Sequence, residues 1–492
     1  MVAVSWTEPV TALAAWGAAL VADLDGAMDG AIGGDSDGAI GGAPELASAA
    51  GPGADANGAD ANGAAGSRLP ADSDPAAPSP LSASPLAPSS AGDPAAPALE
   101  SRRQAQRRLQ REPLPSRRQE PWRFTDTAAL AAIRPARFSG EDRRLAALAA
   151  EALPPPQAGW CRLLLDGASD PLAGVSLPEG VEPLPDDQWA ACLPAADASE
   201  EEPWIGAIAA AAGPLLALRV RAEAMARLEL VSEAGAATGV LPLQLLLLLE
   251  PGARLELLQV HRAAGASLTA VQARIAVGAG AQLQHGLIAQ GNDDGVFAAD
   301  LALRQGFGSQ VAFSSVVSGW GLSRLEPRLV QEAGGARSRL RSLQRCDRRQ
   351  VADQHSAVRF EGPEGQLDQL HKAIAAGSGR SVFNGAVAVP RAAQRTDAAQ
   401  LSRSLLLSDR ARIDTKPQLE IVADDVKCAH GATVTRLQQE ELFYLRSRGI
   451  SAATAGELLL RGFCAEVLQE LPEAAALWQP LHHLLGEEAP AP

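Results

Sequence analysis

The sequence predicts a mainly β fold with a β-helix at its centre. From roughly Leu215 to Ile421, runs of alternating apolar and polar residues begin at glycines, as in 252-GARLELLQV and 280-GAQLQHGLIA. Such alternation marks strands with one buried face. The glycines that open these runs recur at intervals of about 14 residues or twice that, and turns at fixed spacing are typical of a solenoid, whose rungs bury their faces by stacking.

The composition agrees with a repetitive architecture. The chain has 492 residues, which is more than one ordinary core, so two or three structural units are expected. Hydrophobic residues make up 46% of the chain but aromatic residues only 4%, so the core must be built from Leu, Val, Ile and Ala. A β-sandwich is the alternative that the same alternating runs allow.

The N-terminal part divides into three segments. Residues 1–24 contain an amphipathic pattern that predicts one helix over residues 6–24. Residues 25–100 are acidic and rich in Ala, Gly and Pro, with almost no large apolar side chains, so we expect a disordered insert. Residues 101–160 form an N-terminal helical segment, in which Trp122 and Phe124 are expected to anchor the chain on the next domain.

Seven arginines lie between Arg102 and Arg118. They indicate either a solvated basic helix or a patch for an acidic partner, and the solvated helix is the better interpretation of a charge run on its own.

The β-helix core with its lead-in is expected over residues 161–432, and a helical domain over residues 433–492. The run 437-LQQEELFYLRSRG-449 predicts a helix that ends at Gly449. Ser451 can cap a second helix that runs to about Leu471. Pro472 then allows a last helix ending near Leu485.

Several function classes lack their sequence signatures. No Gly-Lys pair occurs, so there is no P-loop, and we expect no ATP bound by this chain. Outside the acidic insert the charge is nearly balanced, which argues against nucleic acid. The run 241-LPLQLLLLL-249 is too short to span a membrane. Five widely spaced cysteines without a CxxC, and no basic leader, favour a reducing, cytoplasmic location.

The segment 424-DDVKCAHGAT-433 carries the candidate site. Cys428 and His430 lie two residues apart, so on a strand their side chains face the same way. A thiolate and an imidazole both bind iron or zinc, but two ligands do not complete a first shell, which suggests completion by another subunit. On spacing alone, a buried cysteine beside a hydrogen-bonded histidine is the better interpretation. Asp424 and Asp425 are adjacent, so on a strand they would face opposite ways and could not act as an acid/base pair.

The remaining histidines and cysteines of interest are interpreted structurally. His355 and His371 lie on alternating runs and are expected to be hydrogen-bonded solenoid residues. Cys464 lies on a predicted helix and is expected to pack in the core.

Read as a whole, residues 417–471 strongly resemble the C-terminal signature of the SufB/SufD family, scaffold subunits of the SUF iron–sulfur cluster assembly machine. Supporting matches are 371-HKAIAAGSGRSVFNGAVAV-389, 394-QRTDAAQLSRSLLLS-408 and 114-LPSRRQEPWRFTD-126. Within the family, CAHGAT favours the SufD branch, since SufB-like chains typically carry a segment close to EHEAT here. The acidic insert and the first 24 residues depart from the pattern.

The resemblance implies a right-handed parallel β-helix flanked by helical N-terminal and C-terminal domains. It also implies pairing with SufB through the β-helices, and docking of the ATPase SufC on the C-terminal helices, for which we select Phe443, Tyr444, Arg448 and Phe463. His430 matches the histidine at the SufB–SufD interface and Cys428 its companion thiol, so both become ligand candidates for a transient iron–sulfur cluster shared with SufB.

The expected function is therefore a SufD-like, non-enzymatic scaffold subunit of a SufBCD complex for ATP-dependent cluster assembly. The alternatives are a β-helix carbohydrate-active enzyme and a self-contained iron–sulfur carrier. Neither has its signature in the sequence, which lacks both a paired-carboxylate constellation and a cluster of thiols. Flavin binding is left open.

Overall fold

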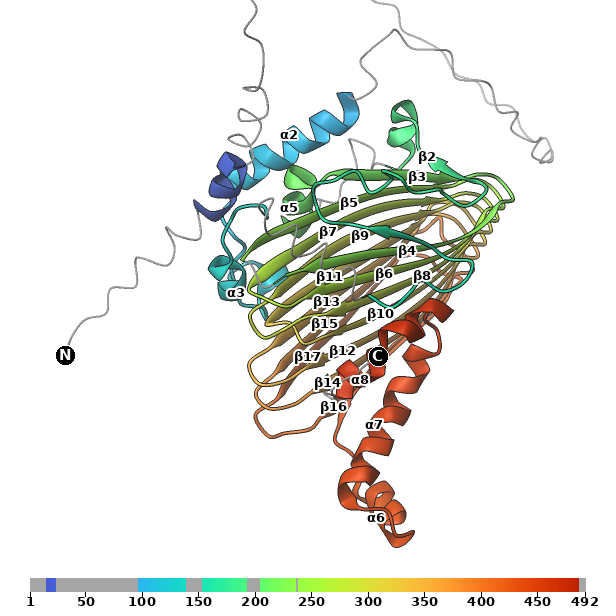
Figure 1. Ribbon diagram of the computed structural model, residues 1–492. Coiled ribbons are helices and arrows are strands. Elements are labelled where there is room, and N and C mark those ends of the chain that lie inside the picture. The colour runs from blue at the N-terminus through green and yellow to red at the C-terminus, as the bar shows by residue number, and fades with distance from the viewer. Residues whose placement is uncertain (1–14, 24–95, 139–152, 193–203, 236–237, 486–492) are drawn as a thin grey trace, which may run out of the picture. The chain divides into compact units, whose positions relative to one another are not determined.

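Two parallel β-sheets wind around a common interior (Figure 1). The computed structural model describes residues 15–23, 96–138, 153–192, 204–235 and 238–485. These residues belong to one unit, made of residues 1–29 and 94–492. A second unit, residues 30–93, lies outside the described residues, and so does the predicted insert up to residue 95.

Each sheet has nine strands, in the orders β1-β4-β6-β8-β10-β12-β14-β16-β18 and β17-β15-β13-β11-β9-β7-β5-β3-β2. Strands two apart in the chain pair in parallel, so the chain alternates between the sheets as it advances. This confirms the parallel β-solenoid and excludes the sandwich. The solenoid strands are β3 Leu215–Val220, β4 Met225–Ala234, β5 Gly239–Leu249, β6 Arg254–Ala263, β7 Ser267–Val277, β8 Gln282–Gln290, β9 Val296–Gln305, β10 Gln310–Ser318, β11 Leu322–Gln331, β12 Arg337–Cys346, β13 Val351–Phe360, β14 Gln366–Ala375, β15 Arg380–Val389, β16 Asp397–Leu406, β17 Arg412–Ile421 and β18 Lys427–Thr435.

Two short strands precede the solenoid and join its sheets. Strand β1 (Cys161–Leu164) pairs in parallel with β4, and β2 (Val181–Pro183) pairs antiparallel with β3. The predicted apolar run at residues 241–249 lies within β5. None of the helices that the structure describes combines the length and the apolar character needed to cross a bilayer.

The turn glycines repeat as the sequence predicts. Gly252, Gly280 and Gly308 have φ values of +73°, +65° and +63°, a backbone region that glycine enters without steric cost. Each donates its N–H to a carbonyl in the equivalent turn of the next rung. In later rungs Glu364 and Arg395 occupy this position, with φ of +61° and +59°.

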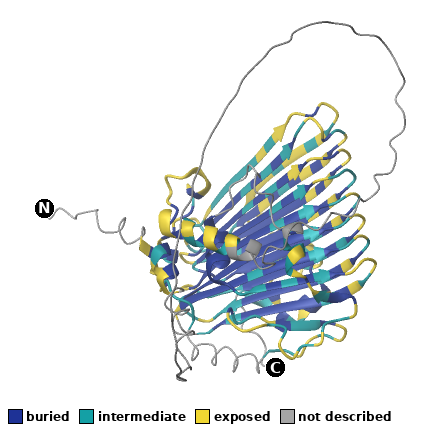
Figure 2. Ribbon diagram, turned by 90° about the horizontal axis from the view of Figure 1, so that it is seen from above, coloured by how far each residue is buried: buried dark blue, intermediate teal, exposed yellow. Residues whose placement is uncertain are grey.

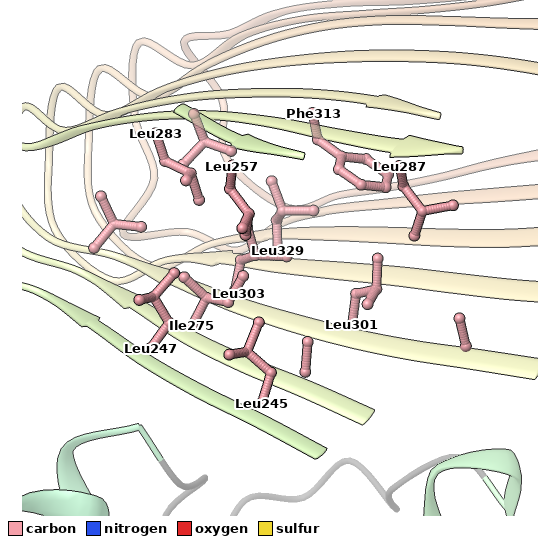
Figure 3. Packing of buried hydrophobic residues seen from close by; sticks show 14 of the residues in the cluster. Leu245, Leu247, Leu257, Ile275, Leu283, Leu287, Leu301, Leu303, Phe313 and Leu329 are labelled. Carbon is pink, nitrogen blue, oxygen red and sulfur yellow. The ribbon is translucent and has the colours of Figure 1, made fainter. Parts of the chain in front are cut away.

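The side chains that fill the interior change from apolar to partly polar along the solenoid. Early rungs are filled by leucines such as Leu245, Leu257 and Leu301 (Figure 3), and the strands are buried over most of their length (Figure 2). From β9 onward, buried glutamines and serines share the interior with apolar side chains, as in the hydrogen-bonded group Gln305, Gln331 and Ser338. The last rungs therefore enclose polar groups that need hydrogen-bond partners.

Helices cover the outer face of the sheet that contains β5, β7 and β9. They are α2 (Ala96–Arg111), the 3₁₀ turn η1 (Glu120–Trp122), α3 (Ala128–Ala132) and α5 (Trp204–Ala212), and residues 15–23 are also helical. All nine residues of α5 are buried. Because α2 starts at Ala96, the predicted insert boundary at residue 100 is too late: Pro97 and the helix formers after it begin a helix.

The predicted anchor is confirmed. Trp122 is buried, and the guanidinium of Arg324 lies 4.4 Å from the centre of its ring. Arg324 also pairs with buried Asp353, which accepts a hydrogen bond from Thr125. Burial alone would raise the pKa of Asp353, but the charges of Arg324 and His355, together with the hydrogen bonds from His355 and Thr125, outweigh it and lower the pKa to about 2. Residues 121–125 are thus held by a ring contact and by an ion pair.

A buried ion triad lies beneath α5. Asp300 is fully buried and receives hydrogen bonds from Arg274 at 2.6 Å and from Arg328 at 2.8 Å. Gly206 of α5 allows this approach, because a Cβ at this position would lie 2.5 Å from Oδ2 of Asp300.

We expect Asp300→Ala to lower the free energy of unfolding by about 3–5 kcal/mol, because the buried guanidinium of Arg274 would lose its ion pair with Asp300. Urea unfolding followed by circular dichroism measures the change. Glu233→Ala, which removes the partly exposed pair with Arg262 at 3.4 Å, is the control and should cost under about 1 kcal/mol. Equal costs for the two variants would show that the Asp300 carboxylate does not compensate a buried charge.

The C-terminal helical elements are α6 (Gln439–Ser447), α7 (Ala452–Leu468), the 3₁₀ turn η3 (Glu473–Trp478) and α8 (Pro480–Leu485). Helices α7 and α8 pack on the outer face of the other sheet, whereas α6 contacts α7 and projects away from the strands (Figure 1). Ser451 caps α7 by accepting a hydrogen bond from the Thr454 N–H, and Gly449 after α6 has φ +86°, both as predicted. The predicted strand end at residue 432 is too early, since β18 stays in register with β16 to Thr435.

Candidate functional site

The last rung of the solenoid is open. Strands β17 and β18 are the final strands of their sheets, so each leaves one edge unpaired within the described chain. Asp424 and Asp425 lie in the exposed turn between these strands. Their placement on opposite faces of a strand was therefore wrong, because the chain reverses direction at this point.

Cys428 and His430 both lie on β18 and face the same way. Cys428 is in register with Ala398 and His430 with Gln400. Both partners on β16 are only 3% exposed and belong to the inward-facing set of that strand. Cys428 is half-buried and packs on the core, whereas His430 is exposed at the open end. The pairing expected from period-two geometry is thus present.

The thiol is not activated in the isolated chain. Burial raises the pKa of Cys428. A hydrogen bond with the Ala398 backbone opposes this with a smaller lowering effect, and the carboxylate of Asp397 raises the pKa by a still smaller amount. Such a thiol keeps its proton until a cation displaces it, which is how cysteine ligands commonly enter a metal site.

The described part of the chain brings too few ligands together for a complete site. Among the residues that the structure describes, no three His, Cys, Asp or Glu side chains come together in a way that could hold a metal. Iron–sulfur clusters are usually held by four protein ligands. Cys428 and His430 can therefore supply only part of a first shell.

A polar ladder inside the last rungs leads to His430. Gln369 Nε2 donates to Ser356 Oγ at 2.7 Å, and Gln400 Nε2 donates to Gln369 Oε1 at 2.9 Å. The Oε1 atom of Gln400 is buried and has no hydrogen-bond partner among the described residues. This ladder was not predicted from the sequence, where the available signal was glutamine at buried positions of alternating runs, as in 365-GQLDQL-370.

The other predicted structural residues behave as expected. His371 is buried, its Nδ1 lies 2.9 Å from Ser342 Oγ, and its ring stacks on Phe383 at 4.1 Å. His355 Nε2 lies 3.1 Å from Asp353. Cys464 is fully buried among the C-terminal apolar side chains. All three belong to the packed fold. His371 on β14 is in register, through Ser402 of β16, with Ala432 on β18, two residues beyond His430.

Helix α6 presents an unburied aromatic surface. None of its residues is buried, and Phe443 and Tyr444 are 71% and 58% exposed. The guanidinium of Arg448 lies 5.3 Å from the Tyr444 ring. Phe463 differs: its ring and its carbonyl both contact Nζ of Lys372, at 4.6 and 2.7 Å. Phe463 is engaged with the solenoid, so it is left out of the aromatic surface formed by Phe443, Tyr444 and Arg448.

Comparison with known proteins identifies this architecture. Residues 232–463 match the family described as "SUF system FeS cluster assembly, SufBD core domain". An iron–sulfur cluster assembly SufBD family protein of Synechocystis sp. is 40% identical over 205 residues, which cover 42% of this chain and 45% of that protein. Protein ABCI7, chloroplastic, of Arabidopsis thaliana is 40% identical over 185 residues, covering 37% and 39%.

The iron–sulfur cluster assembly protein SufD of Escherichia coli is 46% identical over 122 residues, covering 25% of this chain and 29% of that protein. The chain thus matches less than half the length of each of these relatives. The matched core contains both the open rung and most of the solenoid. The parallel solenoid with its terminal helices thus carries, over residues 232–463, a core domain of the SufB/SufD family of iron–sulfur cluster assembly proteins.

Proposed function

We propose that this chain is a SufD-like scaffold subunit of a SufBCD complex, in which it helps to form the site of a nascent iron–sulfur cluster at an interface with SufB. The observation that carries the proposal is the pair Cys428 and His430, which faces the open end of the solenoid as an incomplete ligand set. The cluster is the cargo of this site, and the chain is a scaffold without catalytic residues.

The open rung supports an interface with a second solenoid. The unpaired edges of β17 and β18 offer backbone N–H and C=O groups that can pair with further strands. A SufB solenoid that extends the sheets would bring its own ligands next to Cys428 and His430. The imidazole and thiol of this chain would then hold the growing cluster on one side.

The exposed α6 surface supports a second partner. The sequence contains no Gly-Lys pair, so the ATP-dependent step belongs to another subunit, SufC in this proposal. A helix without buried residues that exposes two aromatic rings is typical of a protein-binding surface. A cytoplasmic location is part of the proposal, and the five free cysteines are consistent with it.

Replacing both aromatic residues of α6, in Phe443→Ser/Tyr444→Ser, should abolish detectable SufC binding and leave thermal stability unchanged, because neither ring is buried in the chain. Isothermal titration calorimetry with SufC measures the affinity, for which we expect a loss of about a hundredfold or more. The matched control is Phe307→Ser, whose ring is 67% exposed in the β9–β10 turn. Weak binding by the control, or full binding by the double variant, would contradict the assignment.

The function is tested by reconstitution. Cognate SufB and SufC are supplied with iron, sulfide and ATP, with or without this chain, and protein-bound iron and sulfide are measured after desalting. The proposal predicts that the chain raises the bound cluster severalfold. An equal yield without the chain would overturn its role as a scaffold.

A further inference from the structure

The polar ladder inside the last rungs has a direction. Gln369 donates its amide N–H to Ser356, and Gln400 donates its amide N–H to the carbonyl of Gln369. Both amides therefore donate to a residue on an earlier strand, β13 for Gln369 and β14 for Gln400, and the carbonyl of Gln369 accepts from the later strand β16. Hydrogen bonds aligned in this way polarise one another, which strengthens the acceptor at the end of the chain.

The ladder ends on an unsatisfied acceptor. Gln400 is 3% exposed, and its Oε1 is buried without a hydrogen-bond partner among the described residues. A buried acceptor without a partner costs about 1–3 kcal/mol. The next residue in this inward-facing column is His430, which is directly in register with Gln400. Its imidazole is the nearest group along the column that can donate an N–H.

We propose that Gln400 is a positioning residue for His430: its Oε1 accepts the N–H of the neutral imidazole. The other ring nitrogen then carries the lone pair and is directed away from the ladder, toward the open end. A ring nitrogen that is fixed as a donor by an acceptor behind it makes the opposite nitrogen a better metal ligand. The inference rests on the proposed function, since it explains how His430 is prepared to bind the cluster.

The surroundings confine the Gln400 amide. Gly385 of β15 faces it across the interior, and a Cβ at Gly385 would lie 2.4 Å from Gln400 Nε2 and 2.8 Å from the Phe383 ring. The space therefore admits the amide only because residue 385 is glycine. The contacts with Gly385 fix the plane of the amide, and the hydrogen bond from Gln400 Nε2 to Gln369 Oε1 directs the carbonyl of Gln400 away from Gln369.

A reversed ladder makes the opposite prediction. With both amides turned over, Gln400 would offer its NH₂ to His430, the lone pair would face the ladder, and the outer nitrogen would carry the proton. Glutamate at position 400 separates the two cases, because a carboxylate accepts from His430 but cannot donate to it.

The first experiment reads the imidazole tautomer in the full chain. The side-chain ¹⁵N shifts of histidine-labelled protein are recorded at pH ~8.5, where an ordinary histidine is neutral, and His430→Gln identifies the signals. We expect one dominant tautomer in the original chain and in Gln400→Glu, and a mixture in Gln400→Met. The matched control is Gln344→Leu, which removes a glutamine that is also 3% exposed and lies in another column.

The second experiment measures cluster yield in the reconstituted complex. Gln400→Met should lower the yield about tenfold, the usual scale for losing such a supporting partner, and Gln400→Glu should largely restore it. If Gln400→Met keeps both the original tautomer and the full cluster yield, while His430→Gln loses the yield, the inference about Gln400 is overturned and the ligand role of His430 is kept. Glutamate behaving like methionine would also overturn it. Full yield in His430→Gln would instead overturn the ligand role of His430, whatever the tautomer shows.

Discussion

Replacing His430 with alanine is expected to lower the yield of protein-bound cluster about tenfold or more in the reconstituted complex. The reason is the small number of ligands: Cys428 and His430 are a partial set on an open rung, and no third candidate joins them among the described residues. Loss of one member leaves a coordination position that only solvent can fill. Loss of a residue that only hydrogen-bonds to a metal ligand lowers metal affinity tenfold to a hundredfold. Loss of a direct ligand should lower it at least as much.

The readouts are iron and sulfide content and the visible absorbance of the desalted complex. Thr433→Ala is the matched control, because Thr433 is exposed on the same strand but belongs to the opposite face. Native gels would confirm that both variants still bind SufB. Undiminished cluster formation by His430→Ala would remove it from the ligand set.

Mild acid is expected to destabilise the solenoid steeply. His261, His285 and His371 are buried inside it beside phenylalanine rings. Burial lowers the pKa of each to about 3 from an ordinary value of 6.5. In the unfolded chain these imidazoles take up a proton near pH 6.5, but in the folded chain only near pH 3.

The difference between the folded and unfolded pKa values decides in which direction stability changes with pH. Stability is fully present above about pH 6.5 and is lost progressively as the pH falls toward 3, because the unfolded state binds more protons. Each histidine contributes about 2 kcal/mol of loss between pH 7 and pH 5, or ~6 kcal/mol together. Since whole domains are stable by only 5–15 kcal/mol, we expect a large fall in the urea midpoint over this range.

The measurement is urea unfolding from pH 7 to pH 4. His371→Leu should remove about one third of the pH dependence. Phe383→Leu, which trims the ring stacked on His371, is the control: it should lower stability at every pH without changing the slope. A flat stability between pH 7 and pH 5 would show that these histidines are not buried in the neutral form.

Much of the solenoid could be predicted because short sequence patterns indicate its strands and turns. Alternation and recurring glycines identified the strands and the turns from Gly252 to Gly335. The later turn positions at Glu364 and Arg395 carry no such signal, since their left-handed backbone is imposed by hydrogen bonds to the neighbouring rung. The extension of β18 to Thr435 has the same origin, because pairing with β16 decides where the strand ends.

In the candidate site too, local features could be predicted from the sequence, whereas pairing between distant strands could not. That Cys428 and His430 face one way follows from the two-residue period of a strand. Which residue lies beneath His430 depends on the register between strands about 30 residues apart, which no local pattern specifies, so Gln400 and Gln369 were missed. Phe463 was selected with Phe443 and Tyr444 as a docking residue, because a helical pattern cannot show that Phe463 contacts Lys372 on β14.

Native mass spectrometry of this chain co-expressed with its cognate SufB and SufC tests the scaffold function most directly. We expect one assembly with one copy of this chain, one SufB and one SufC on each of the two scaffold subunits, and the loss of one SufC in Phe443→Ser/Tyr444→Ser. A chain that remains monomeric in the presence of both partners would contradict the scaffold function.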